Sequence, residues 1–83
     1  MQVGFKEPGV GSIEYEDDLI ILKGGNFTEN SKVCVNGKEV ETTFYGDTVL
    51  AISKDSLNVG DTYTIRQVDR NDTVLMETFE YAY

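Results

Sequence analysis

The sequence predicts an all-β fold, and three observations lead to that prediction. Short runs rich in β-branched and aromatic residues recur along the 83-residue chain, with turn-forming residues about every 8–12 positions. No segment shows the sustained period of about 3.6 residues that marks an amphipathic helix. Asn36-Gly37 separates two strand-like runs, and both central residues of a type I′ hairpin turn need positive φ, which Asn and Gly tolerate best.

Seven strands and the turns between them follow from this reading. The expected strands are 12–15, 19–23, 33–35, 38–45, 48–53, 63–68 and 73–83. The expected turns are Glu16-Asp17-Asp18, Gly24-Gly25-Asn26, Asn36-Gly37, Gly46-Asp47 and Asp69–Asp72. Residues 28–32 and 54–62 are polar connectors, and residues 1–12 form an irregular lead-in or first strand, since they contain the only proline and three glycines.

The first strands are recognised from their alternation. Ile13 and Tyr15 would share one face of the opening strand. Residues 19–23 are apolar on both faces, as expected near the centre of a sheet. Phe27 then follows the glycine turn, where it can plug the core beneath it. We expect Val33 to face one way and Cys34 the other, with Cys34 partly exposed.

The later strands rest on similar patterns. Val49 and Ala51 alternate with Leu50 and Ile52 in the strand at 48–53. Strand 63–68 is preceded by Leu57-Asn58-Val59-Gly60-Asp61-Thr62-Tyr63. This spacing fits a tyrosine corner, in which a Tyr hydroxyl bonds back to the backbone a few residues upstream. The alternative is an ordinary loop followed by a strand-facing tyrosine. Together these features favour an immunoglobulin-like β-sandwich of about seven antiparallel strands.

The chain also resembles a known family. Leu19–Gly24 followed by Asn26-Phe27 resembles the strand, glycine and Asn-Phe signature of IPT/TIG domains, which are immunoglobulin-like early-set sandwiches. The resemblance continues through Lys32–Gly37, the strand at 49–52 and the loop at 57–63, and covers roughly residues 13–83. The family usually opens with a clearer proline-bearing strand than residues 1–12 provide.

This resemblance implies a module rather than an enzyme. IPT/TIG domains occur in cell-surface receptors, as accessory units of extracellular bacterial enzymes, and in some transcription factors. The resemblance therefore implies a single domain, residues 1–83, within a larger bacterial surface or secreted protein. Its expected partners are neighbouring domains of the parent chain, or a cell-surface glycan or protein, and the isolated domain is expected to be a monomer.

Composition narrows the functions further. Fifteen acidic and seven basic residues give a net charge of −8, and the basic residues are scattered, so no nucleic-acid partner is expected. Solubility explains this acidity more simply than a cation site does. No apolar run approaches the roughly 18 residues that span a membrane, so we expect no direct membrane insertion.

The chemistry available to the chain is limited by two residue counts. The sequence has no histidine, which excludes a Ser-His-Asp triad, a Cys-His pair and any His-containing zinc site within it. Its single cysteine, Cys34, forms neither an internal disulfide nor a multi-Cys metal site. We therefore predict neither an enzyme nor a cofactor.

Clustered carboxylates leave a calcium site as the weaker alternative. Asp17-Asp18 and Asp69–Asp72 are the two clusters, and they could meet at one end of the sandwich. Calcium takes six to eight oxygens at one point, whereas Asp and Asn also suit a plain turn. Turns are the preferred interpretation.

Aromatic side chains offer the more plausible binding surface. The candidate contact residues are Phe44, Tyr45, Tyr81 and Tyr83. Phe79, Tyr81 and Tyr83 would share one face of a long final strand, and that face is either core or a stacking surface for sugar rings or a neighbouring domain. We thus expect a non-catalytic accessory, spacer or interaction module, extracellular or at the cell surface. The alternative is a carbohydrate-binding module using exposed aromatics.

Overall fold

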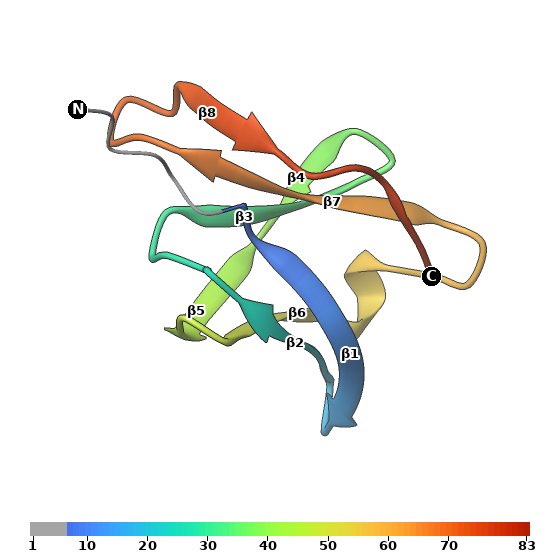
Figure 1. Ribbon diagram of the computed structural model, residues 1–83. Helices are drawn as coiled ribbons and strands as arrows, with labels where there is room; N and C mark the ends of the chain where they lie inside the picture. Colours follow the sequence, from blue (N-terminus) through green and yellow to red (C-terminus); the bar gives the residue numbers. More distant parts are fainter. Residues whose placement is uncertain (1–6) are drawn as a thin grey trace.

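The computed structural model describes residues 7–83, which form two packed antiparallel sheets (Figure 1). The strands are β1 (Gly9–Glu16), β2 (Leu19–Gly25), β3 (Ser31–Val35), β4 (Lys38–Val40), β5 (Thr42–Gly46), β6 (Val49–Ser53), β7 (Thr62–Val68), β8 (Val74–Glu77) and β9 (Tyr81–Ala82). A short 3-10 helix, η1 (Lys54–Ser56), follows β6. The all-β sandwich prediction is confirmed, with nine strands in the described residues rather than about seven.

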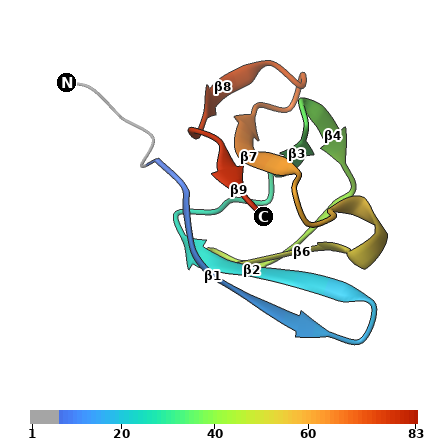
Figure 2. The ribbon, with the colours of Figure 1, turned by 90° about the vertical axis from the view of Figure 1, so that its right-hand side faces the viewer.

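The sheets are stacked as two layers, as Figure 2 shows. One has four strands in the order β1-β2-β6-β5. The other has five: β4-β3-β7-β8 in order, with β9 also paired to β7. Every pairing is antiparallel, which fits the alternating patterns of the sequence.

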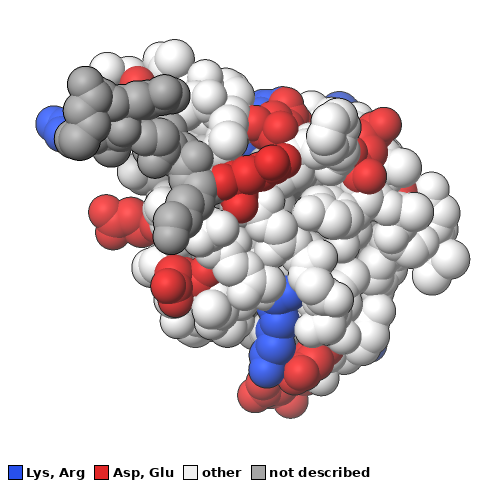
Figure 3. Space-filling view, in the orientation of Figure 1, with Lys and Arg blue, Asp and Glu red and all other residues white. Residues whose placement is uncertain are grey.

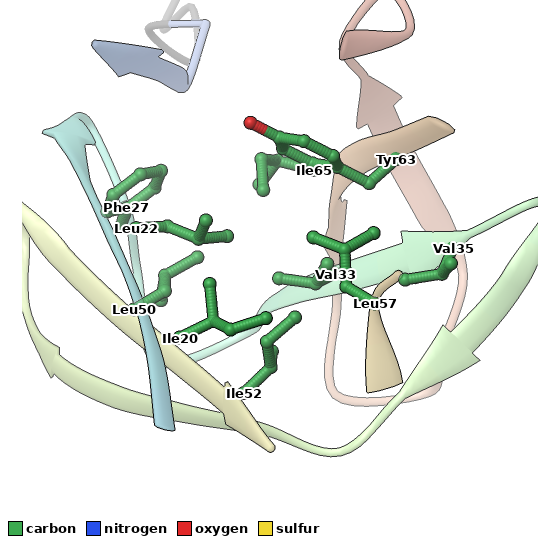
Figure 4. Close-up of a cluster of buried hydrophobic side chains, with 10 residues drawn as sticks. All are labelled: Ile20, Leu22, Phe27, Val33, Val35, Leu50, Ile52, Leu57, Tyr63 and Ile65. Carbon is green, nitrogen blue, oxygen red and sulfur yellow. The ribbon is translucent and has the colours of Figure 1, made fainter. Parts of the chain in front are cut away.

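The core lies between the layers and draws side chains from both sheets (Figure 4). Its buried members are Ile20, Leu22, Phe27, Val33, Val35, Leu50, Ile52, Leu57, Tyr63 and Ile65. Successive residues of a strand point to opposite faces, so Ile20 and Leu22 enter the core while Ile21 points away from it. Phe27 is buried beneath the end of β2, as predicted.

The two longest predicted strands are each divided, and a threonine hydroxyl lies at each break. At 38–45 the chain passes from the five-stranded to the four-stranded sheet between β4 and β5. There the Thr42 hydroxyl accepts a hydrogen bond from Val33 N (2.9 Å) and donates one to Val40 O (3.0 Å). At 73–83 the Thr78 hydroxyl accepts a bond from Ile65 N (3.0 Å). In both places a threonine hydroxyl accepts the hydrogen bond from a strand N–H group that a backbone carbonyl would otherwise accept.

The glycine pair at 24–25 belongs to a strand rather than to the predicted turn. Gly24 pairs with Val10, and β2 continues to Gly25. A Cβ on Gly24 would lie 1.7 Å from Gly9 O, so the close approach of β1 and β2 requires glycine at this position. The turn begins instead at Asn26, whose φ is 63°.

The opening of the chain is more regular than predicted. β1 begins at Gly9 and carries a bulge between Val10 and Ser12. The part of the expected lead-in at residues 1–6 lies outside the described residues. The hairpin at Asn36-Gly37 is confirmed, with φ of 51° and 85° at the two residues.

Only part of the predicted tyrosine corner is present. Leu57 is buried and Gly60 has φ of 99°, as predicted. The hydrogen bonds among residues 7–83 do not include one from the Tyr63 hydroxyl back to this loop. The Asp61 carboxylate holds the loop instead, accepting bonds from Asn58 N (2.9 Å) and Asn36 Nδ2 (3.0 Å). These bonds, that of Asn58 foremost, lower the pKa of Asp61.

Candidate functional site

The four aromatic residues singled out from the sequence fall into two separate pairs. Tyr81 and Tyr83 lie at the C-terminal end of the chain, are half-buried, and pack against the core. Phe44 and Tyr45 lie on β5, at one edge of the four-stranded sheet, and both are exposed. The four residues therefore do not form one surface.

Tyr81 and Tyr83 belong to a group of four tyrosines that joins the two sheets. We call it the tyrosine seam: Tyr15, Tyr63, Tyr81 and Tyr83. The Tyr63 and Tyr81 rings stack, with centroids 5.2 Å apart, and Val10 N of β1 donates to the Tyr81 hydroxyl (3.2 Å). The Tyr15 and Tyr83 hydroxyls are 2.7 Å apart. This hydrogen bond, together with desolvation, raises the pKa of Tyr83 to about 12. The seam accounts for this pair of tyrosines as part of the fold.

The exposed aromatic rings point in different directions. Phe44 pairs with the core residue Leu50, so it lies on the inner side of β5, and it is 39% exposed. Tyr45, 61% exposed, lines a hollow with outer-face residues of the same sheet. Phe79, 90% exposed, follows β8 in the other sheet. These rings do not combine into a platform for stacking several sugar units.

The outer side of the four-stranded sheet is apolar along its two central strands. We call this surface the apolar face: Leu19, Ile21, Tyr45, Val49 and Ala51. Ile21 pairs directly with Ala51 and lies between Leu19 and Lys23 on its own strand. Ala51 is only 1% exposed and lies at a hollow of 210 Å³, and a second hollow of 370 Å³ is lined by the other four residues of the apolar face.

Acidic residues border the apolar face on both sides. Glu14 and Glu16 of β1 line the larger hollow, and Glu41 lines the smaller one beside β5. Lys23 lies within the larger hollow and forms an exposed ion pair with Glu14 (3.3 Å), which contributes little to stability. Figure 3 shows acidic groups spread over one side of the molecule with few basic groups among them. With three glutamates and one lysine, the margin is negative overall.

The apolar face was not singled out from the sequence, although a signal for it was present. The strand at 19–23 is apolar on both faces, and the run Val49-Leu50-Ala51-Ile52 is apolar throughout. In an antiparallel sheet only one side must face the core. Two neighbouring strands that are apolar on both sides therefore predict an outer apolar surface.

The outer side of the five-stranded sheet has a polar centre, with the exposed Phe79 beside it. We call it the polar face: Lys32, Cys34, Thr64, Arg66 and Glu77, placed together by the pairing of β3, β7 and β8. Thr64 Oγ1 donates to Glu77 Oε2 (2.6 Å), and Arg66 Nη2 lies 3.3 Å from the same oxygen. The bond from Thr64 and the charge of Arg66 lower the pKa of Glu77.

Cys34 is buried, which corrects the expectation of partial exposure. It points away from the core, as predicted, but is only 1% exposed. It lines the floor of a 470 Å³ hollow whose other members include Thr64 and Glu77. Neighbouring side chains of the polar face thus cover a residue that alternation alone would place at the surface. Burial raises the pKa of the Cys34 thiol.

The two carboxylate clusters form separate turns. Asp17 lies in the β1–β2 hairpin turn with φ of 53°. Asp69 Oδ1 accepts bonds from Asn71 N (2.8 Å) and Thr73 N (2.9 Å), which closes the β7–β8 turn. The two turns lie far apart in Figures 1 and 2, so the suggested meeting of the clusters is wrong. Within residues 7–83 no group of three or more potential ligand side chains is placed to hold a metal ion.

Comparison with known proteins gives no relative. No protein-family model, no curated protein and no solved structure matches this chain. Among residues 7–83 there is no helix long and apolar enough to cross a membrane. The apolar face and its acidic margin are thus the features from which a function has to be argued.

Proposed function

We propose that this chain is a non-catalytic interaction or spacer module of a larger extracellular protein, akin to an IPT/TIG domain. Its apolar face is the contact surface, and the partner is a neighbouring domain or another protein. The observation that carries the proposal is the position of five apolar side chains on the outer side of a sheet whose inner side already supplies the core.

The composition of the apolar face supports protein contact. Protein interfaces are depleted of charge at their centre, enriched in aromatic residues, and polar at their rim. Ile21, half-buried beside the buried Ala51, lies at such a centre, Tyr45 supplies an aromatic side chain, and Glu14 and Glu16 form part of the rim. The 210 Å³ hollow beside Ala51 gives this surface the relief that a complementary side chain can fill.

The acidic margin defines the chemistry of the partner. A surface that covers the apolar face also approaches Glu14, Glu16 and Glu41. Complementary potentials speed association and suppress wrong partners. The partner surface therefore has an apolar centre and basic side chains around it, and a second copy of this acidic chain does not fit that description.

Photo-cross-linking within the full parent protein tests the proposal. A photoreactive phenylalanine analogue replaces Tyr45 or, as the matched control, Phe79, which is exposed on the other sheet. We expect a discrete product from position 45, mapped to an apolar segment with basic neighbours, and its loss on adding Ile21→Asp. Equal yield at position 79, or a product that survives Ile21→Asp, would contradict the proposal.

A carbohydrate ligand is the second candidate, and one observation favours it. Tyr45 offers an exposed ring beside a 370 Å³ hollow that also contains Glu14 and Glu16. A ring that stacks on a sugar and carboxylates that accept bonds from its hydroxyls could hold one unit. Titration of the labelled domain with cell-wall oligosaccharides tests this, with amide shifts at residues 14–21 and 45–49 expected. If no oligosaccharide of the series shifts these amides, the protein-contact function remains as the single proposal.

A further inference from the structure

The edges of the two sheets differ in how well they are protected against strand addition. An edge strand exposes unpaired backbone groups, and proteins protect such edges with short strands, bulges or charges. β4, β8 and β9 have three, four and two residues. β5 has five residues and is interrupted by a bulge between Phe44 and Gly46.

β1 is the exception among these edges. It has eight residues, and within the described range 7–83 its one partner strand is β2. From Ser12 to Glu16 five consecutive residues are in unbroken register with β2, so the opposite edge of this stretch is regular as well. Near the beginning of the strand, the Tyr81 hydroxyl accepts a hydrogen bond from Val10 N. Residues 12–16 therefore form a regular edge that continues beyond this contact.

Side chains on β1 specify what could pair with it. Glu14 and Glu16 lie on the outer side of the sheet, where they pair across the strands with Ile21 and Leu19. Ile13 and Tyr15 lie on the other side, and Tyr15 is 59% exposed although its hydroxyl is bonded to Tyr83. Directly opposed side chains of opposite charge stabilise a strand pair, and like charges destabilise it.

We propose that residues 12–16 of β1 bind an extended segment of another protein by strand addition, and that the segment alternates basic and apolar side chains. The basic side chains lie opposite Glu14 and Glu16, and the apolar ones cover Tyr15 and Ile13. Main-chain hydrogen bonds supply affinity, and the alternation supplies specificity. Pairing of two copies through β1 would oppose glutamates of both chains in a molecule of net charge −8, so the partner is a basic segment rather than a second copy.

A blocked synthetic peptide of alternating Lys and Val is the probe, titrated into the isotope-labelled chain. We expect amide shifts and slowed hydrogen exchange centred on residues 12–16. A peptide with the same residues arranged as a Lys block and a Val block should bind about tenfold more weakly. Shifts centred elsewhere, or equal binding of the block peptide, would overturn the proposal.

N-methylation of the peptide tests the hydrogen bonds without altering the protein. Alternate amides of an added strand face β1, and the intervening ones face solvent. Methylating one alternate set should weaken binding at least about tenfold, whereas methylating the other set should leave it nearly unchanged. Equal effects of the two sets would exclude strand addition.

Charge reversal tests the predicted alternation. Glu14→Lys with Glu16→Lys should shift the preference from the Lys-Val peptide to a Glu-Val peptide. Glu29→Lys with Glu39→Lys changes the net charge equally at exposed sites away from β1 and should leave the preference for Lys-Val. If both pairs of substitutions reversed the peptide preference, net charge alone would explain it and the assignment to β1 would be refuted. Concentration-dependent self-association that protects residues 12–16 without peptide would also refute the proposal.

Discussion

The two outer faces of the sandwich have the same alternating geometry but opposite chemistry. On the five-stranded sheet, Thr64 and Arg66 both bond to Glu77, beside the buried Cys34. On the four-stranded sheet, Ile21 and Val49 have no such internal partners and form part of an apolar surface with an acidic margin. This difference underlies the proposal that the apolar face, rather than the polar face, is the contact surface.

The largest expected effect separates the inner side of β2 from its outer side. Ile20→Ala should lower the free energy of unfolding by about 3 kcal/mol, because it leaves a cavity in a fully buried site. Ile21→Ala, one residue later on the apolar face, should cost less than about 1 kcal/mol. Urea denaturation of the two variants measures both. Equal losses would mean that Ile21 is part of the core and not of a contact surface.

A second pair of variants tests how β1 is attached beside the apolar face. Gly24→Ala forces a methyl group against Gly9 O, and we expect it to destabilise the fold by about 2 kcal/mol. Gly25→Ala is the matched control, since nothing lies within 4 Å of its added methyl group; its change should stay near 0.5 kcal/mol. Thermal denaturation of both proteins gives the comparison, and indistinguishable melting curves would refute the close packing of β1 on β2.

The polar face should contribute a pH-dependent part of stability. The pKa of Glu77 is lower in the folded chain than its ordinary value of 4.5, so the unfolded chain binds more protons between the two values. The contribution is therefore complete above about pH 4.5 and is lost as the pH falls through the folded pKa. Because Glu77 is partly exposed, it should amount to less than about 1 kcal/mol.

Glu77→Gln removes this contribution and should flatten the fall in unfolding free energy below about pH 5. Glu29→Gln, in the exposed loop before β3, serves as the control and should leave the slope unchanged. Denaturant titrations over a series of pH values measure the slopes. Identical pH profiles of unfolding free energy for the two variants would argue against a stabilising interaction of Glu77 with Thr64 and Arg66.

The smallest expected effect concerns the tyrosine seam that links the sheets. Tyr83 has its pKa raised to about 12 by the bond with Tyr15 and by desolvation. Stability from this shift is present below the ordinary value of 10 and is lost as the pH rises through 12. Tyr15→Phe should return the highest phenol titration toward 10, as followed by phenolate absorbance. An unchanged titration curve would mean that the two hydroxyls are not paired.

Local patterns were sufficient to predict the class of fold and most of its strands. Alternation places Ile20 and Leu22 in the core, and the turn preference of Asn36-Gly37 correctly gives the hairpin of β3 and β4. The breaks at Thr42 and Thr78 could not be predicted, because each depends on a backbone group from a distant strand, Val33 N and Ile65 N. Gly24 was misread for a similar reason: its role is set by the backbone of β1.

The candidate surface was predicted less well than the fold. Of the four aromatic residues, only Tyr45 lies on the apolar face. Phe44 lies on the inner side of the same strand, and Tyr81 and Tyr83 are part of the seam. The positions of Tyr81 and Tyr83 depend on the end of β8 at Glu77, just before Thr78, so the alternation expected of one long strand does not apply. Cys34 was misplaced because alternation gives the direction of a side chain but not what covers it.

The most direct test of the apolar face as a contact surface is the yield of the cross-link from position 45 with and without Ile21→Ser. The measurement is made in the parent protein, with the fold of the variant verified by its unfolding curve. The account predicts a domain that stays folded, with a loss of less than about 1 kcal/mol, and a cross-link that largely disappears. A retained cross-link in the folded variant would contradict it.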